Sequence, residues 1–170
     1  SYLVLNGKFY LSMPAESSGA LKVVELVSNQ PLELPPGTDS LAATSRDEIF
    51  GVSYAAERET QLWSGKFLES RVQAVASKSI SLLPISITTS ASSSIFLVYP
   101  GSIHRYSSET LEFDYNYRFS DGGQVSPVPF AVADDGKFLF TAHKYKGIVE
   151  IWDAGNSAPE KNPLTGVTIN

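Results

Sequence analysis

Short apolar runs, each introduced by a single polar residue, recur along the chain at similar intervals. Four of them can be set in register: KFYL at 8–11, EIFG at 48–51, SIFL at 94–97 and KFLF at 137–140. The first apolar residues of these runs are Phe9, Ile49, Ile95 and Phe138, spaced by 40, 46 and 43 residues. In this register we expect Phe138 to be buried, so its replacement by Ala should cost about 3–5 kcal/mol.

The first and last copies predict a strand, a two-residue turn and a second strand. Asn6-Gly7 and Asp135-Gly136 suit type I′ turns, because both central residues take positive φ, which Asn, Asp and Gly tolerate. A third apolar run follows in each copy, at 21–26, 61–63, 102–106 and 148–152. Alternating residues at 32–34 and 111–119 predict outer strands.

A self-similar unit of this length, with four short strands, is typical of a β-propeller blade. The chain is therefore predicted to be all-β, with about four four-stranded antiparallel blades in a single propeller segment. The approximate blades are 1–38, 39–80, 81–125 and 126–161, and 162–170 reads as the start of a further strand, which would open a fifth blade.

Four blades are fewer than most propellers have. Three explanations stay open: half of a ring completed by a second polypeptide or a second copy, a fragment of a longer protein, or a closed four-bladed ring. We favour half of a seven- or eight-bladed ring, because terminal blades with uncovered apolar faces need a partner.

Composition narrows the classes of partner. The net charge is −5, and the densest basic stretch is 143–146, His-Lys-Tyr-Lys, so nucleic acid is not expected as a partner. No apolar run approaches the roughly 18 residues of a membrane span. Cysteine is absent and no Asn-x-Ser/Thr site occurs, which favours a soluble, cytoplasmic protein without fixing the compartment.

The segment 130–153, FAVADDGKFLFTAHKYKGIVEIWD, resembles a blade of the lactonase-type propellers. It is similar to the group of 6-phosphogluconolactonases and fungal carboxymuconate cyclases, and the resemblance would cover the N-terminal half of such a protein. Trp152-Asp153 also resembles the dipeptide of WD-repeat propellers, the second choice. The Gly-His pair that usually begins a WD repeat is missing from all four copies, which favours the lactonase-like group.

The resemblance to the cyclases implies a histidine in the central channel, ahead of the strand that opens a middle blade. The corresponding stretch here, 122–129, reads GGQVSPVP and contains no histidine. Proton transfer needs a group that titrates near neutral pH, or a carboxylate whose pKa is raised. The part of the ring given by this sequence therefore looks catalytically impaired, and no catalytic residue is assigned.

Several side chains remain as candidates for binding. Arg71 and Arg118 could pair with carboxylates of a ligand, since guanidinium groups bind carboxylates in a two-pronged way. His104 and His143 lie near third strands and are candidate ligand contacts. Trp63 and Trp152 end third strands, where they either pack between blades or, with Tyr145, form an interaction rim. No metal or cofactor site is recognised.

Two functions follow from these observations. The first is a non-catalytic or catalytically impaired module that binds a partner protein or a small ligand and completes its ring with a second chain. The alternative is a lactonase or cycloisomerase (an intramolecular lyase) that acts on a small carboxylic acid or lactone. In that case most catalytic residues would come from the other half of the ring.

Overall fold

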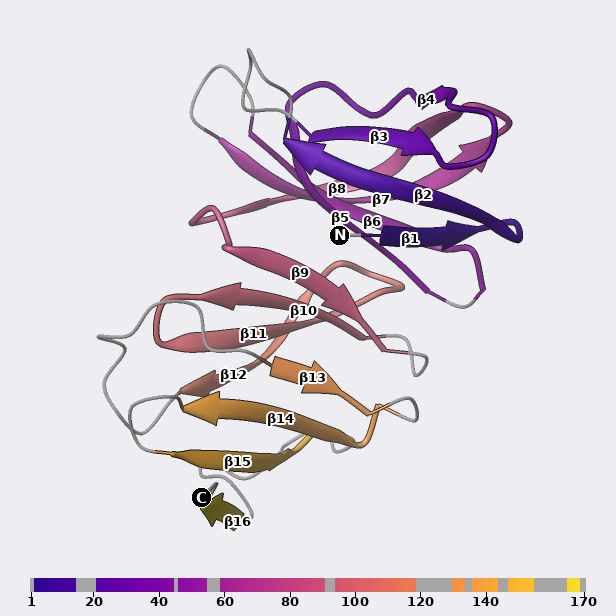
Figure 1. The fold of residues 1–170 in the computed structure, drawn as a ribbon. Coiled ribbons are helices and arrows are strands. Elements are labelled where there is room, and N and C mark those ends of the chain that lie inside the picture. The colour runs from indigo at the N-terminus through magenta and orange to yellow at the C-terminus, as the bar shows by residue number, and fades with distance from the viewer. Residues whose placement is uncertain are drawn as a thin grey trace. The chain divides into compact units, whose positions relative to one another are not determined.

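The computed structural model describes residues 2–14, 21–44, 46–54, 59–90, 94–118, 130–133, 136–143, 147–154 and 165–168. In these ranges the chain forms 16 strands and no helix, and the strands make four four-stranded antiparallel sheets (Figure 1). The chain divides into two compact units, Ser1–Thr88 and Thr89–Asn170. Apart from residues 86–88, which belong to the third sheet, each unit contains two of the sheets. The predicted all-β class and the four-stranded blades are confirmed.

The first sheet has the order β1-β2-β3-β4, and the strands are β1 (Tyr2–Leu5), β2 (Lys8–Pro14), β3 (Leu21–Glu25) and β4 (Pro31–Leu32). β1 and β2 are joined by Asn6-Gly7, and both residues have positive φ, at 49° and 71°. This is the backbone that a type I′ turn requires, as the sequence predicts.

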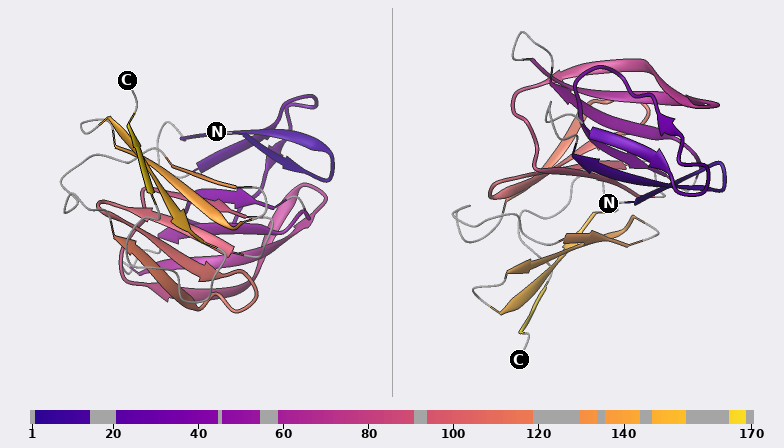
Figure 2. Two further views of the ribbon diagram at one scale, coloured as in Figure 1. Left: turned by 90° about the horizontal axis from the view of Figure 1, so that it is seen from below. Right: turned by 45° about the horizontal axis from the view of Figure 1, so that its top comes forward.

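The second sheet has the order β5-β6-β7-β8, and the strands are β5 (Thr38–Ala43), β6 (Ile49–Tyr54), β7 (Thr60–Leu68) and β8 (Arg71–Ile80). β7 and β8 form a long hairpin, visible in both views of Figure 2. Its turn meets the end of the first sheet, where the backbone N–H of Glu33 donates to Ser70 O at 2.9 Å and Val72 N–H donates to Glu33 O at 2.7 Å. These two bonds tie the outer strands of the two sheets together.

The second unit repeats the pattern. The third sheet contains β9 (Ser86–Thr89), β10 (Ser94–Tyr99), β11 (Ser102–Ser107) and β12 (Phe113–Arg118). The fourth contains β13 (Phe130–Val132), β14 (Phe138–His143), β15 (Ile148–Asp153) and β16 (Thr165–Thr168). β16 pairs with β15. Within the predicted segment 162–170, Thr165–Thr168 therefore form the outer strand of the fourth sheet.

Each unit has its own apolar core between its two sheets. In the first unit, Trp63 from β7 packs with Leu3 and Leu5 from β1. In the second unit, the rings of Tyr117 from β12 and Trp152 from β15 meet edge-on, with centroids 5.9 Å apart. Both tryptophans are at most 2% exposed. They pack between neighbouring sheets, so neither belongs to an exposed interaction rim.

The register predicted for the apolar runs is wrong by one residue in two sheets. Phe9 and Phe138 are 54% and 40% exposed, and the residues after them, Tyr10 and Leu139, are buried. Successive side chains of a strand point to opposite faces, so a one-residue shift exchanges the inner and outer sets. β6 and β10 are buried on both faces, so Ile49 and Ile95 are buried in either register. The apolar runs of these two strands therefore do not reveal the one-residue shift.

Candidate functional site

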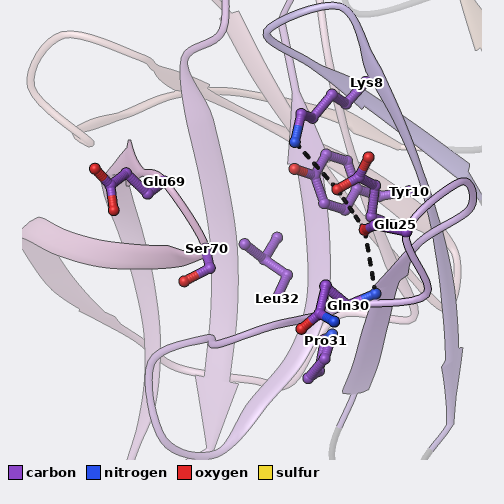
Figure 3. Close-up of a pocket in the computed structure, with 9 residues that line it drawn as sticks. Lys8, Tyr10, Glu25, Gln30, Pro31, Leu32, Glu69 and Ser70 are labelled. Atoms are coloured by element: carbon purple, nitrogen blue, oxygen red, sulfur yellow. Dashed lines mark hydrogen bonds and ion pairs between the residues drawn. The ribbon is translucent and has the colours of Figure 1, made fainter.

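A pocket of about 210 Å³ opens in the first unit, where the first sheet meets the turn between β7 and β8. Figure 3 shows its walls: Lys8, Tyr10 and Glu25 lie on one side, Glu69 and Ser70 lie on the other, and Leu32 lies between them. Ser28, Gln30 and Pro31 from the β3–β4 connection complete the lining among the described residues. We call this the Glu25 pocket.

The Glu25 carboxylate is held by two donors. Lys8 Nζ and Ser28 Oγ both donate to Oε2 of Glu25, at 3.1 and 2.8 Å. The hydrogen bond from Ser28 and then the bond from Lys8 keep the pKa of Glu25 below its usual value. At neutral pH this wall of the pocket therefore carries a carboxylate beside an ammonium group.

Tyr10 supplies a hydroxyl to the same wall. Only 3% of the residue is exposed, and its ring packs edge-on against Phe67 with centroids 6.0 Å apart. Burial is the main reason why the pKa of Tyr10 is raised, so the phenol stays protonated. The hydroxyl has no hydrogen-bond partner among the described residues, although it borders the pocket.

A second group of polar and aromatic side chains lies on one face of the third sheet, in the second unit. The His104 ring lies 4.4 Å from the Tyr99 ring and 5.6 Å from the Phe113 ring, between centroids. Its Nε2 is 3.3 Å from the Ser102 hydroxyl. Burial, and secondarily the charge of Arg118, lowers the pKa of His104, so the imidazole is neutral at pH 7.

Arg118 ends β12 directly across from Ser102 in the strand register. It is exposed and borders a groove of about 460 Å³, lined among the described residues by Phe113, Asp114, Tyr115, Asn116 and Arg118. The structure thus brings together two of the predicted ligand contacts, His104 and Arg118, on one face of the third sheet.

The other predicted contacts lie elsewhere. Arg71 is exposed at the start of β8, in the first unit, and does not share a unit with His104 and Arg118. His143 is the last residue of β14, across from Ile148. Tyr145 and the stretch 122–129, which corresponds to the position of the channel histidine in the cyclases, lie outside the described residues.

A buried arginine holds the two sheets of the second unit together. Arg105 Nε donates to Asp114 Oδ2 at 2.6 Å, and its terminal nitrogen donates to the backbone oxygen of Ala154, just after β15. Arg105 is 3% exposed, so its charge is buried and needs both partners. This group is structural.

No local pattern in the sequence predicts the Glu25 pocket. Lys8 and Glu25 are 17 residues apart on neighbouring strands, and Glu69 comes from the next sheet. Alternation predicts that Tyr10 lies on a strand, but the position of its hydroxyl depends on how β2 packs against β7. A single sequence carries no local signal for such a contact.

Within the described residues, no group of three or more His, Cys, Asp or Glu side chains is arranged to hold a metal ion. No helix long and apolar enough to cross a membrane occurs in the part of the chain that the structure describes.

Comparison with known proteins adds the architecture. No family model and no curated protein matches the chain. Among solved structures, it is similar to a putative 6-phosphogluconolactonase from Bacteroides uniformis, with a TM-score of 0.66 and 15% identity over 94% of this chain and 53% of that one. It is also similar to BamB from Moraxella catarrhalis, with a TM-score of 0.60 and 8% identity over 99% of this chain and 47% of that one.

The fold is that of a β-propeller. The predicted likeness to lactonase-type propellers is confirmed at the level of the fold, which is all that identities of 15% and 8% can show. The chain spans about half the length of the solved structures that it matches.

Proposed function

We propose that this chain is a binding module: it contributes propeller blades to a larger ring, completed by a second chain, and holds a partner protein or a small ligand without reacting with it. The observation that carries this proposal is the direction of the pKa shifts in the described residues. A general acid or base works best when its pKa lies near the operating pH.

Apart from His104, whose pKa is lowered from 6.5, the resolved shifts move groups away from that range. The pKa of Glu25 is lowered, so it remains a carboxylate. Burial raises the pKa values of Tyr10, Tyr99 and Tyr106, and it raises the pKa of Tyr117 to about 12. These groups keep one protonation state around pH 7. Groups that keep one protonation state are suited to recognising a ligand rather than to exchanging protons with it.

The proposed completion of the ring rests on the extent of the structural likeness. The chain aligns over 94% of its own length but only 53% of the putative lactonase, and propellers usually have up to eight blades. The test is the mass of the native species by light scattering, with mass spectrometry of every chain present. A mass near twice 18.4 kDa, or a second chain of similar size, supports the proposal. A monodisperse species of 18.4 kDa contradicts it.

One observation favours the alternative, a lactonase or cycloisomerase. His104 is neutral, contacts the Ser102 hydroxyl and lies near Arg118, which could hold a carboxylate or phosphate. The test is hydrolysis of 6-phosphogluconolactone and of δ-gluconolactone, followed in a pH-stat. A rate above the spontaneous one that is lost in His104→Gln would establish the enzyme. A rate equal to the buffer control supports the binding module.

A further inference from the structure

We propose that the Glu25 pocket binds a small neutral polyhydroxylated molecule of monosaccharide size. This inference gives the small-ligand form of the proposed function a site and a ligand class, and it rests on that function. The protein leaves several hydrogen-bonding groups unused in the pocket, and their charges and the size of the space define the ligand class.

The Tyr10 hydroxyl is the first such group. Its residue is 97% buried, and the hydroxyl lacks a partner among the described residues while facing the pocket. The hydroxyl is open to the pocket, where a ligand hydroxyl can replace water as its hydrogen-bond partner. A phenol can donate one hydrogen bond and accept others, so its natural partner is a group that does both.

Lys8 and Glu25 have further hydrogen-bonding atoms available in the same pocket as the Tyr10 hydroxyl. The Lys8 ammonium carries three N–H donors and spends one on Glu25. Both donors to Glu25 use Oε2, so Oε1 has no bonded partner among the described residues. A ligand hydroxyl can accept from Lys8 and donate to Glu25 at the same time. Two adjacent hydroxyls can engage all three residues.

The charges select against ions. An anionic ligand would meet the carboxylates of Glu25 and Glu69, and a cationic ligand would meet the ammonium of Lys8 (Figure 3). The Lys8–Glu25 pair is neutral as a unit, and the one remaining charge of the described lining, that of Glu69, is exposed and screened by solvent. The pocket therefore gains little from binding an ion. A neutral molecule with several hydroxyls uses the same donors and acceptors without this repulsion.

The space sets the size of the ligand. About 210 Å³ is below the roughly 300–1,000 Å³ of pockets for drug-sized molecules. Leu32 and Pro31 line one part of the pocket with apolar atoms, against which the C–H face of a sugar ring can pack. A single sugar ring meets both conditions.

The test is NMR titration of the ¹⁵N-labelled full chain with D-glucose and D-galactose up to about 100 mM, a range that detects weak binding. D-Glucosamine and D-glucuronate serve as a cation and an anion of the same shape. We expect saturable shifts in residues around the pocket with at least one neutral sugar, and weaker binding of both charged analogues. No saturable shift with either neutral sugar, or tighter binding of a charged analogue, would overturn the proposal.

Variants assign the binding to the pocket. Tyr10→Phe removes only the hydroxyl, which has no partner to lose, so the variant should fold. It should raise Kd about three- to tenfold, the worth of one hydrogen bond. Tyr54→Phe, an exposed tyrosine of β6 outside the pocket, is the matched control and should leave Kd unchanged. Unchanged binding in Tyr10→Phe would overturn the proposal.

The sugar titration tests the pocket proposal, and the mass measurement tests completion of the ring, so each can contradict one proposal without the other. A chain that binds sugar as an 18.4 kDa monomer would contradict the completed ring and leave the pocket proposal standing. A chain of double mass that binds no sugar would contradict the pocket proposal alone.

Discussion

At the scale of single residues, the close approach of Gly51 to Trp63 determines how β6 and β7 pack. The two residues are directly paired, and a Cβ atom on Gly51 would overlap the indole ring. We expect Gly51→Ala to destabilise the protein by about 1–3 kcal/mol, as overpacking does in a buried site. Urea denaturation gives the free energy of unfolding.

A second variant shows whether the ring is the cause. In a Trp63→Phe background the smaller ring leaves room for the added methyl group, so Gly51→Ala should cost less there than in the native chain. Equal costs in both backgrounds would mean that the two residues are not coupled.

The neighbouring positions Phe138 and Leu139 give a second prediction at this scale. Leu139 is fully buried in the core of the second unit, whereas Phe138 is 40% exposed. Leu139→Ala should therefore cost about 2–5 kcal/mol, the usual price of a buried leucine. Phe138→Ala should cost clearly less, contrary to the value expected from the sequence. If denaturation ranks the two variants in the opposite order, the described register of β14 is wrong.

At the scale of elements, Glu25 links β2 to the β3–β4 connection in a pH-dependent way. Its pKa is lower in the folded protein than the ordinary value of 4.5, so its contribution to stability is present above pH 4.5. That contribution is lost as the pH falls through the folded pKa. Glu25→Gln should therefore show a smaller loss of stability than the native chain between neutral pH and pH values below 4.5.

The control for this prediction is Glu59→Gln, an exposed carboxyl in the same unit. It should follow the native pH dependence in urea denaturation. An identical pH dependence for Glu25→Gln and the native chain would show that the bonds from Ser28 and Lys8 do not favour the charged form.

Arg105 gives a second element-scale prediction, because it joins β11, β12 and the segment after β15. Arg105→Ala should cost about 3–5 kcal/mol, because a buried charge network loses its central member. Arg105→Lys should recover only part of this, because a single ammonium cannot reproduce the guanidinium fork. Asp114→Asn leaves the buried Arg105 charge without its carboxylate, so it should also destabilise the protein, although the Asn oxygen can still accept the hydrogen bond from Nε. Full stability in Arg105→Lys would contradict this account.

The sequence predicts the elements better than the contacts between them. The third strands expected at 21–26, 61–63, 102–106 and 148–152 all lie on β3, β7, β11 and β15, because alternation and turn residues are local signals. The inward and outward faces of the strands are harder to predict. A strand buried on both faces, such as β10, has no polar face that marks its register, so aligning Phe138 with Ile95 of that strand gave the wrong face for Phe138. The Glu25 pocket was missed because its residues meet only through pairing and packing.

At the scale of the whole molecule, the structural likeness leads to a prediction about assembly. If a second copy of this chain completes the ring, two sets of four sheets would give eight blades, within the usual range. Folding and association would then be linked, so Tm should rise with protein concentration. Calorimetry over a wide range of concentration, beside light scattering on the same samples, measures both.

The concentration dependence also separates the possible partners. Association with a second copy predicts that Tm and mass both fall on dilution of the pure chain. A different chain as the partner predicts that the pure chain melts at a concentration-independent Tm until that partner is added. A constant Tm and a mass of 18.4 kDa that no added chain changes would contradict completion of the ring by a second polypeptide. The contacts within each unit would still stand, because the core around Trp63 and the core around Trp152 each lie inside one unit.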